Sequence, residues 1–151
     1  MTDSIVSFLT PRLDSYIAEL TTISGMDSYS FDREDVNKVV DWLDARLSKL
    51  GFSVERHHED KAGDNLLATR KGSGKGKVLL LGHSDTVFPR GTTAQRPVTI
   101  NGDTILGPGT CDMKAGLLVG IYAVEALDSI GFTDYEELSF LIVSDEEIDE
   151  R

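Results

Sequence analysis

The first 51 residues contain two stretches in which apolar residues recur at helical spacing. In residues 5–20 the apolar stripe is interrupted only by Pro11, which the first turns of a helix tolerate at the cost of a kink. This helix is expected to end near Gly25. The second stretch follows Asp32, a suitable N-cap, and its stripe over residues 36–50 stops at a glycine. Both stretches predict helices.

Short apolar runs further along the chain predict strands. Residues 52–57 and 65–71 are separated by a polar turn, and we expect them to pair. Residues 78–81 (Val-Leu-Leu-Leu) and 138–143 are continuous apolar runs, which are typical of strands buried on both faces.

Between these two buried strands, the sequence predicts a hairpin over residues 97–106, turning at residues 101–103, and a helix from about Lys114 to Ser129. Helices that alternate with buried strands indicate an α/β fold, a layered sheet with helices on both faces. The length of 151 residues and a hydrophobic content of 40% are sufficient for one domain with its own core.

The chain is acidic, and its charge argues against some classes of binding partner. It has 15 Lys and Arg against 26 Asp and Glu, which gives a formal net charge of −11 at pH 7. Such a surface repels phosphate backbones and anionic lipids, so the composition argues against nucleic-acid and membrane-surface binding. The expected partner is a small molecule, a cation or another protein.

Nothing near the N-terminus resembles a secretion signal. Asp3 stands where a signal peptide needs basic residues, and the longest apolar run, residues 115–124, has about half of the roughly 20 residues that a membrane span needs. The single Cys111 excludes an internal disulfide and any zinc site that needs two thiolates. We therefore expect a cytoplasmic protein.

Polar residues that can bind a metal follow the first buried strand. His83 and Asp85 lie two positions apart in an extended segment, so their side chains share one side while Ser84 faces the other. A serine triad is therefore unfavourable, because the nucleophile would face away from its base. A metal site could use both residues, with His83 as a ligand and Asp85 orienting its ring. A His-x-Asp pair on its own is nevertheless common by chance.

A glycine-rich segment, residues 107–116, is expected to bring Asp112 to the start of the following helix, where the helix dipole favours a carboxylate. The segment fails as a dinucleotide loop, because Asp112 replaces the last glycine and would repel a pyrophosphate. The glycine-rich residues 72–77 fail as a phosphate-binding loop, because Gly76 follows Gly74 and Lys75 at the position where a Ser or Thr is required.

Adjacent carboxylates follow the second buried strand. If Glu147 binds a metal, Glu146 stays free to remove a proton from a metal-bound water, whose pKa the metal lowers toward about 7. Taken alone, such an acidic run is more often a solvated turn.

Together, three segments resemble the co-catalytic zinc peptidases and amidohydrolases that include glutamate carboxypeptidase, aminoacylase, acetylornithine deacetylase and succinyl-diaminopimelate desuccinylase. The segments are residues 82–89 (Gly-His-Ser-Asp-Thr-Val-Phe-Pro), 107–116 (Gly-Pro-Gly-Thr-Cys-Asp-Met-Lys-Ala-Gly) and 144–147 (Ser-Asp-Glu-Glu). Their order and separation also resemble the family pattern. The N-terminal helices and the hairpin are most similar to the glutamate carboxypeptidase branch.

The resemblance implies a role for each matching residue. His83 would bind one zinc ion, Asp112 would bridge two, and Glu147 would bind the other. Glu146 would be the general base and proton shuttle, and Asp85 would orient His83. The peptide bond after Asp112 is expected to be cis.

The implied activity is zinc-dependent cleavage of an amide bond that releases a free amino acid, as in a carboxypeptidase or an N-acyl-amino-acid deacylase. Two zinc ions are expected, with cobalt or manganese as substitutes, and a small-molecule or peptide substrate with a free carboxylate. Residues 1–151 correspond to the N-terminal portion of the catalytic domain. The remaining ligands, the lid and a domain for homodimerisation would be absent, so the chain alone is expected to bind zinc weakly, to be inactive, and to self-associate through exposed apolar surface.

Two alternatives remain open at this stage. Cys111 could act as a nucleophile with His57 or His58 as its base, although a small half-buried thiol is the ordinary interpretation. The chain could also be a truncated, non-catalytic relative that serves as a binding or interaction module. The retention of Glu146 argues against this second alternative.

Overall fold

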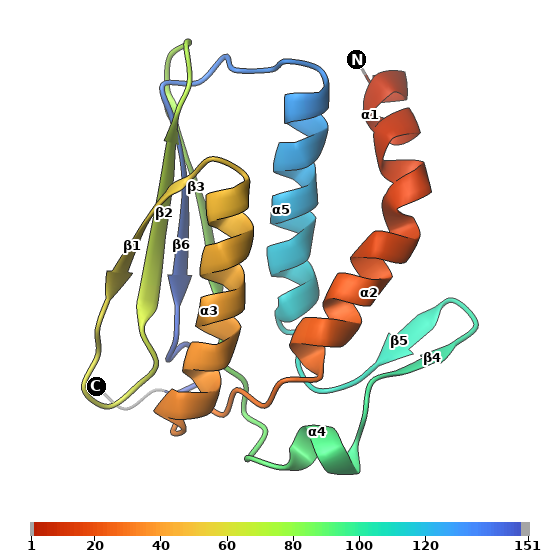
Figure 1. The fold of residues 1–151 in the computed structure, drawn as a ribbon, viewed down its shortest axis with the longest axis vertical. Coiled ribbons are helices and arrows are strands. Elements are labelled where there is room, and N and C mark those ends of the chain that lie inside the picture. The colour runs from red at the N-terminus through yellow and green to blue at the C-terminus, as the bar shows by residue number, and fades with distance from the viewer. Residues whose placement is uncertain (1, 149–151) are drawn as a thin grey trace.

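A computed structural model describes residues 2–148 of the chain (Figure 1). The elements follow in the order α1 (Thr2–Leu9), η1 (Thr10–Arg12), α2 (Leu13–Ser24), α3 (Arg33–Lys49), β1 (Ser53–His57), β2 (Asn65–Lys71), β3 (Lys77–His83), α4 (Thr92–Gln95), β4 (Thr99–Asn101), β5 (Thr104–Leu106), α5 (Lys114–Ser129) and β6 (Glu137–Val143). None of the helices within residues 2–148 is long and apolar enough to cross a membrane.

The N-terminal helical segment is divided at Pro11, as the sequence predicts. Pro11 lies in η1, a short 3₁₀ turn between α1 and α2, where its missing N–H costs little. Helix α2 ends at Ser24 with Gly25 as its C-cap. Helix α3 begins after Asp32, whose side chain accepts a hydrogen bond from the backbone N–H of Asp35. The predicted kink, helix end and N-cap are confirmed.

Four strands form one mixed sheet in the order β1-β2-β6-β3. The predicted pairing of β1 with β2 is confirmed and is antiparallel, while β6 runs antiparallel to β2 and parallel to β3. In the parallel pair, His83 at the end of β3 lies opposite Val143 at the end of β6. The two strands therefore deliver the residues that follow them to the same edge of the sheet. The predicted hairpin is also present, as β4 and β5.

Helices α3 and α5 cover one face of the sheet, and α1 and α2 pack on the outer side of α5 (Figure 1). The core lies between sheet and helices, where side chains such as Leu43, Leu66, Leu118 and Ile142 are almost completely buried. Gly120 allows α5 to approach the sheet closely, since a Cβ there would lie 2.9 Å from the ring of Phe140. The α/β class is confirmed. The expectation of helices on both faces is not met within residues 2–148, because α3 and α5 lie on the same face and α1 and α2 pack outside α5.

The prediction that residues 78–81 form a strand buried on both faces is wrong. Val78, Leu79 and Leu81 are 47%, 58% and 65% exposed. Within the described part of the chain β3 is an edge strand, paired with β6 alone. On the uncovered face, Leu81 lies beside Leu141, which in turn lies beside Leu67. Leu79 shares this face of β3 with Leu81. The apolar run thus reflects an edge strand with two exposed leucines that extend a row of leucines across the uncovered face, and we call these residues (Leu67, Leu79, Leu81 and Leu141) the leucine row.

This leucine row predicts self-association of the 151-residue chain. An exposed apolar patch next to an unpaired strand edge favours contact with other copies. We expect the mean mass measured by light scattering to rise with protein concentration, and the double variant Leu79→Lys/Leu81→Lys to suppress that rise. The exposed pair Thr99→Lys/Thr104→Lys on the separate hairpin is the control. A wild-type chain that stays monomeric at high concentration would contradict this prediction.

The buried carboxylate of Asp35 makes the fold sensitive to acid. Burial raises its pKa, but hydrogen bonds and ion pairs with Lys38 and Arg90 outweigh burial, so its pKa lies below the ordinary 3.8. Because the folded pKa is the lower one, the stabilisation is fully present above the unfolded value and is lost as the pH falls through the folded value.

We therefore expect Asp35→Asn to be less stable than wild type at neutral pH, with the difference shrinking once the pH falls below 3.8. Urea unfolding followed from about pH 7 down to about pH 2.5 measures both curves. Asp14→Asn, at an exposed position on α2, makes the same change of charge and is the control. A stability difference that is independent of pH would show that Asp35 does not carry this acid dependence.

Candidate metal centre

Three separate segments converge at the edge of the sheet where β3 and β6 end. His83 is the last residue of β3, Glu147 follows β6, and Asp112 lies in the loop before α5. One nitrogen or oxygen of each of these side chains lies within 4.8 Å of the others. His83 is buried, Glu147 is half-buried, and Asp112 is exposed. The structure thus brings together all three residues that the sequence suggests as metal ligands.

The imidazole of His83 is held between two carboxylates. Its Nδ1 lies 3.2 Å from Oδ1 of Asp85, and its Nε2 lies 3.0 Å from Oδ1 of Asp112. Donation from Nδ1–H to Asp85 leaves Nε2 as the nitrogen that can bind a cation on the side of Asp112. The backbone N–H of His83 donates to the sulfur of Met113, the residue after Asp112.

The charges of the cluster fit a bound cation. Burial lowers the pKa of His83, but its contacts with Asp85 and Asp112 outweigh burial and raise the pKa to about 9. Burial raises the pKa of Glu147, and the negative charge of Asp112 raises it further. A divalent cation would take the place of the proton between His83 and Asp112, and it would offset the repulsion at Glu147. One imidazole with two carboxylates is also a donor set that suits zinc.

The carboxylate of Asp85 joins the ring of His83 to the loop that carries Glu146 and Glu147. This carboxylate is completely buried. Oδ1 accepts the backbone N–H of Glu146 at 3.3 Å, and Oδ2 accepts that of Glu147 at 3.2 Å. Burial raises the pKa of Asp85, but hydrogen bonds from His83 and Ser30 outweigh burial and lower it, so this carboxylate stays ionised. This position of Asp85 agrees with its expected role of orienting the ring of His83.

Glu146 lies beside the three candidate ligands but does not belong to their cluster. Its side chain is 57% exposed, and its Oε2 lies 3.9 Å from Nε2 of His83. The carboxylate therefore faces the cluster while remaining accessible from solvent. Ser84 is buried on the other side of the strand, where its hydroxyl donates to the carbonyl of Val143. This arrangement agrees with the argument against a serine triad.

The loop before α5 has the backbone form that the family resemblance implies, because the peptide bond between Asp112 and Met113 is cis. Gly109 in this loop has a positive φ of 71°. Lys114, the residue that follows Met113, is almost completely buried, and its ammonium group donates to the carbonyl of Met26 at 2.8 Å. Asp112 is thus fixed to the body of the protein by its neighbours.

Cys111 is exposed, so the expectation of a half-buried thiol is wrong. It lies in the glycine-rich loop, which crosses the surface before α5 begins. His57 ends β1, and Nδ1 of His58 lies 3.0 Å from the carboxylate of Asp64. The described residues give Cys111 no histidine partner within hydrogen-bond distance, and the structure offers no support for a thiol nucleophile.

Sequence reasoning missed Ser30 and Lys114. Ser30 is completely buried and donates to Oδ2 of Asp85 at 2.6 Å. The two residues are 55 positions apart, and the segment around Ser30 has no regular pattern that predicts this contact. Lys114 belongs to a quoted motif, but the burial of its ammonium group depends on tertiary packing that the motif does not reveal.

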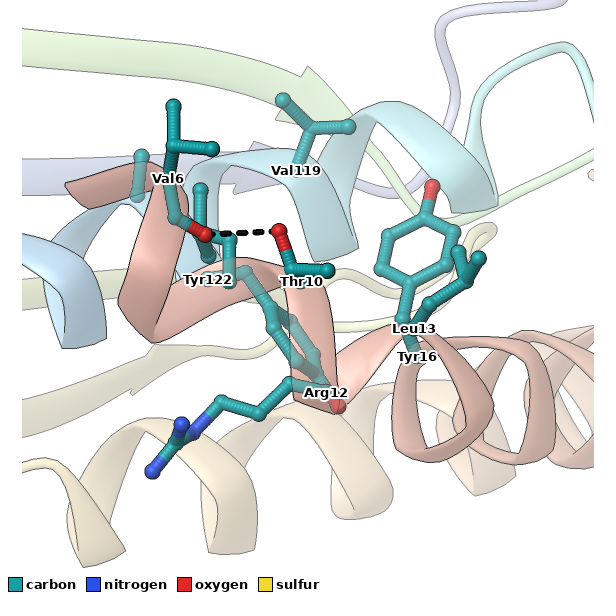
Figure 2. Close-up of a pocket in the computed structure, with 9 residues that line it drawn as sticks. Val6, Thr10, Arg12, Leu13, Tyr16, Val119 and Tyr122 are labelled. Atoms are coloured by element: carbon teal, nitrogen blue, oxygen red, sulfur yellow. Dashed lines mark hydrogen bonds between the residues drawn. The ribbon is translucent and has the colours of Figure 1, made fainter. Parts of the chain in front are cut away.

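A cavity beside the N-terminal helices lies elsewhere and does not resemble an active site. It has a volume of about 550 Å³ and lies between α1, α2 and α5, with a mostly apolar lining that includes Val6, Leu13 and Val119 (Figure 2). Two of its hydroxyl groups are directed to backbone carbonyls, since Thr10 donates to the carbonyl of Val6 and Tyr16 to that of Ala115. The convergent polar groups that chemistry requires are at the sheet edge, not in this cavity.

Comparisons with known proteins found related sequences and structures. Residues 79–150 match the family described as Peptidase family M20/M25/M40. Carboxypeptidase G2 of Pseudomonas sp. (strain RS-16) is 32% identical over 140 residues, which cover 91% of this chain and 34% of that protein. Acetylornithine deacetylase of Aliivibrio fischeri (strain MJ11) is 36% identical over 149 residues, covering 91% of this chain and 36% of that protein.

The solved structures show the same fold. The crystal structure of human carnosine dipeptidase 1 has a TM-score of 0.79 at 18% sequence identity, and the match covers 95% of this chain and 34% of that one. The chain therefore spans about a third of the length of these relatives.

Proposed function

Because this chain belongs to the peptidase family M20/M25/M40, we propose that it supplies the metal centre of a zinc-dependent hydrolase. The proposed reaction cleaves an amide bond and releases a free amino acid, as a carboxypeptidase or an N-acyl-amino-acid deacylase does. The observation that carries this proposal is the convergence of His83, Asp112 and Glu147, whose candidate ligand atoms lie within 4.8 Å of one another. The names of two relatives, a carboxypeptidase and a deacetylase, support the two versions of the reaction.

Two zinc ions, with cobalt or manganese as substitutes, are the proposed cofactors. His83 would hold one ion, Glu147 the other, and Asp112 would bridge them. When bound, such ions polarise an amide carbonyl and lower the pKa of water. Asp85 keeps the ring of His83 in the tautomer that presents Nε2 to the metal, and it fixes the backbone of Glu147 at the same time.

Glu146 is the proposed general base and acid. Its carboxylate takes a proton from the attacking water and passes it to the leaving nitrogen of the amide. Two observations support this role: the side chain is accessible from solvent, and its Oε2 lies 3.9 Å from Nε2 of His83. The hydrogen bond from its backbone N–H to Asp85 fixes the main chain at Glu146 and leaves the carboxylate free.

We propose that residues 1–151 correspond to the N-terminal portion of the catalytic domain. The match to about a third of each relative supports this assignment. The remaining metal ligands, the groups that bind the free carboxylate of the substrate, and the lid and dimerisation domain would then belong to the rest of the catalytic unit. The proposed assembly of the whole protein is a homodimer.

This proposal predicts that the 151-residue chain alone binds zinc weakly and hydrolyses neither N-acyl amino acids nor dipeptides. A catalytic zinc normally has three protein ligands, and here each ion would have two. Titration calorimetry with Zn²⁺ and assays on both substrate classes measure this. A chain extended to the length of its relatives should hydrolyse one class, lose activity to a chelator, and regain it with zinc. Full activity of the short chain, or chelator-resistant activity of the extended one, would contradict the proposal.

A further inference from the structure

We infer that Ser30 is a positioning residue of this metal centre, which it serves by holding the carboxylate of Asp85 against His83 and the backbone of Glu146 and Glu147. The inference rests on the proposed function for the metal itself. Its geometric part rests only on contacts within the described residues.

The first observation is the setting of Ser30. Its hydroxyl donates to Oδ2 of Asp85 at 2.6 Å, and both residues are completely buried. The backbone N–H of Ser30 donates to the carbonyl of Thr86, and the N–H of Thr86 donates to the carbonyl of Ser28. This short parallel bridge fixes the segment 28–30 beside the continuation of β3. The hydroxyl therefore reaches Asp85 from a rigid backbone.

The second observation is that the two oxygens of Asp85 accept hydrogen bonds from different partners. Oδ1 accepts from the ring of His83 and from the N–H of Glu146, while Oδ2 accepts from Ser30 and from the N–H of Glu147. One carboxylate thus joins the histidine to the loop that carries both glutamates. A rotation of this carboxylate would therefore weaken its hydrogen bonds to His83, to Ser30 and to the backbone of both glutamates at the same time.

Ser30 is the partner that resists such a rotation. Among residues 2–148, it is the one side chain bonded to the carboxylate of Asp85 that is not itself a candidate metal ligand. Its removal would leave Oδ2 buried with a single donor, the N–H of Glu147. A buried charged oxygen that loses a hydrogen bond is unfavourable, so the carboxylate is expected to turn toward other donors.

The chain provides a matched control for this idea. Ser28 lies two residues away in the same segment and is equally buried, yet its hydroxyl has no hydrogen-bond partner in the described structure. Ser28→Ala therefore removes the same atom from the same environment without touching Asp85. Ser30→Thr keeps the hydroxyl and is the conservative variant.

The experiment uses the 151-residue chain and two readouts. Titration with Co²⁺, followed by visible absorption, measures metal affinity and coordination. Amide hydrogen exchange by NMR in the metal-free chain measures the protection of the N–H groups of Glu146 and Glu147. For Ser30→Ala we expect roughly tenfold weaker Co²⁺ binding, the low end of the range for partners of metal ligands, and faster exchange at both amides. Ser28→Ala should leave both readouts within about twofold of wild type.

The outcomes separate this inference from the proposed function. If wild type binds no Co²⁺, the proposed metal centre is wrong, and amide exchange then tests only whether Ser30 holds the carboxylate of Asp85 against the backbone of Glu146 and Glu147. If Ser30→Ala matches Ser28→Ala in amide exchange, or if Co²⁺ binding is unchanged, the positioning role is overturned. Should Ser30→Ala fail to fold, Ser30→Thr and Ser30→Cys form a graded series, in which the stronger donor must give the tighter binding and the slower exchange.

Discussion

Replacing Glu146 with glutamine in a catalytically competent, full-length form of the protein is expected to lower kcat by about 10²–10⁴-fold, the range that a general base contributes. Glutamine has nearly the same shape and can still form hydrogen bonds, but it cannot take a proton from water. The side chain of Glu146 is exposed, and its main chain is held by Asp85 through the backbone N–H. The substitution should therefore leave the fold and the metal content unchanged.

The measurement is steady-state hydrolysis with metal content determined on the same samples. Asp145→Asn changes the charge of the neighbouring, exposed residue by the same amount and is the control. Its kcat should stay close to wild type. A Glu146→Gln variant that retained full activity would exclude Glu146 as the base and would direct attention to another carboxylate of the cluster.

The features that could be predicted from sequence are those that local chemistry decides. The apolar stripe of α3 and its N-cap at Asp32 follow from spacing within a few turns. The alternation of an extended segment puts His83 and Asp85 on the same side, and their 3.2 Å contact agrees with that. The parallel ends of β3 and β6 could likewise be expected to bring their loops together.

The features that could not be predicted depend on which elements pack against one another in the folded chain. The apolar residues of β3 have the composition of a central strand. Within residues 2–148, however, β3 lies at the sheet edge and no helix covers the face of Leu81, which is 65% exposed. Whether a strand has one neighbour or two is a property of the topology, to which a run of four residues is insensitive. Ser30 illustrates the same limit, because its contact with Asp85 exists only once the segment after α2 runs beside β3.

Removal of Asp112 is expected to have the largest effect on metal binding. Asp112 is the carboxylate that faces Nε2 of His83, and its charge also acts on Glu147. Loss of an outer partner of a metal ligand typically costs 10–100-fold in affinity, so the loss of the proposed bridging ligand should cost more than about 100-fold. The side chain is 73% exposed, and Asp112→Ala is therefore expected to fold normally.

Titration of the 151-residue chain with Co²⁺ measures the effect. Asp103→Ala, in the exposed turn between β4 and β5, is the control for the loss of one negative charge, and it should shift affinity only slightly because exposed charges are screened. The thermal stability of the metal-free chain is measured beside the affinity. The variant should lose metal binding with little change in stability, because losing the contact with His83 and relieving the repulsion at Glu147 act in opposite directions. An affinity within tenfold of wild type would mean that Asp112 does not bind the metal, and that its contact with His83 is a hydrogen bond without a role in metal binding.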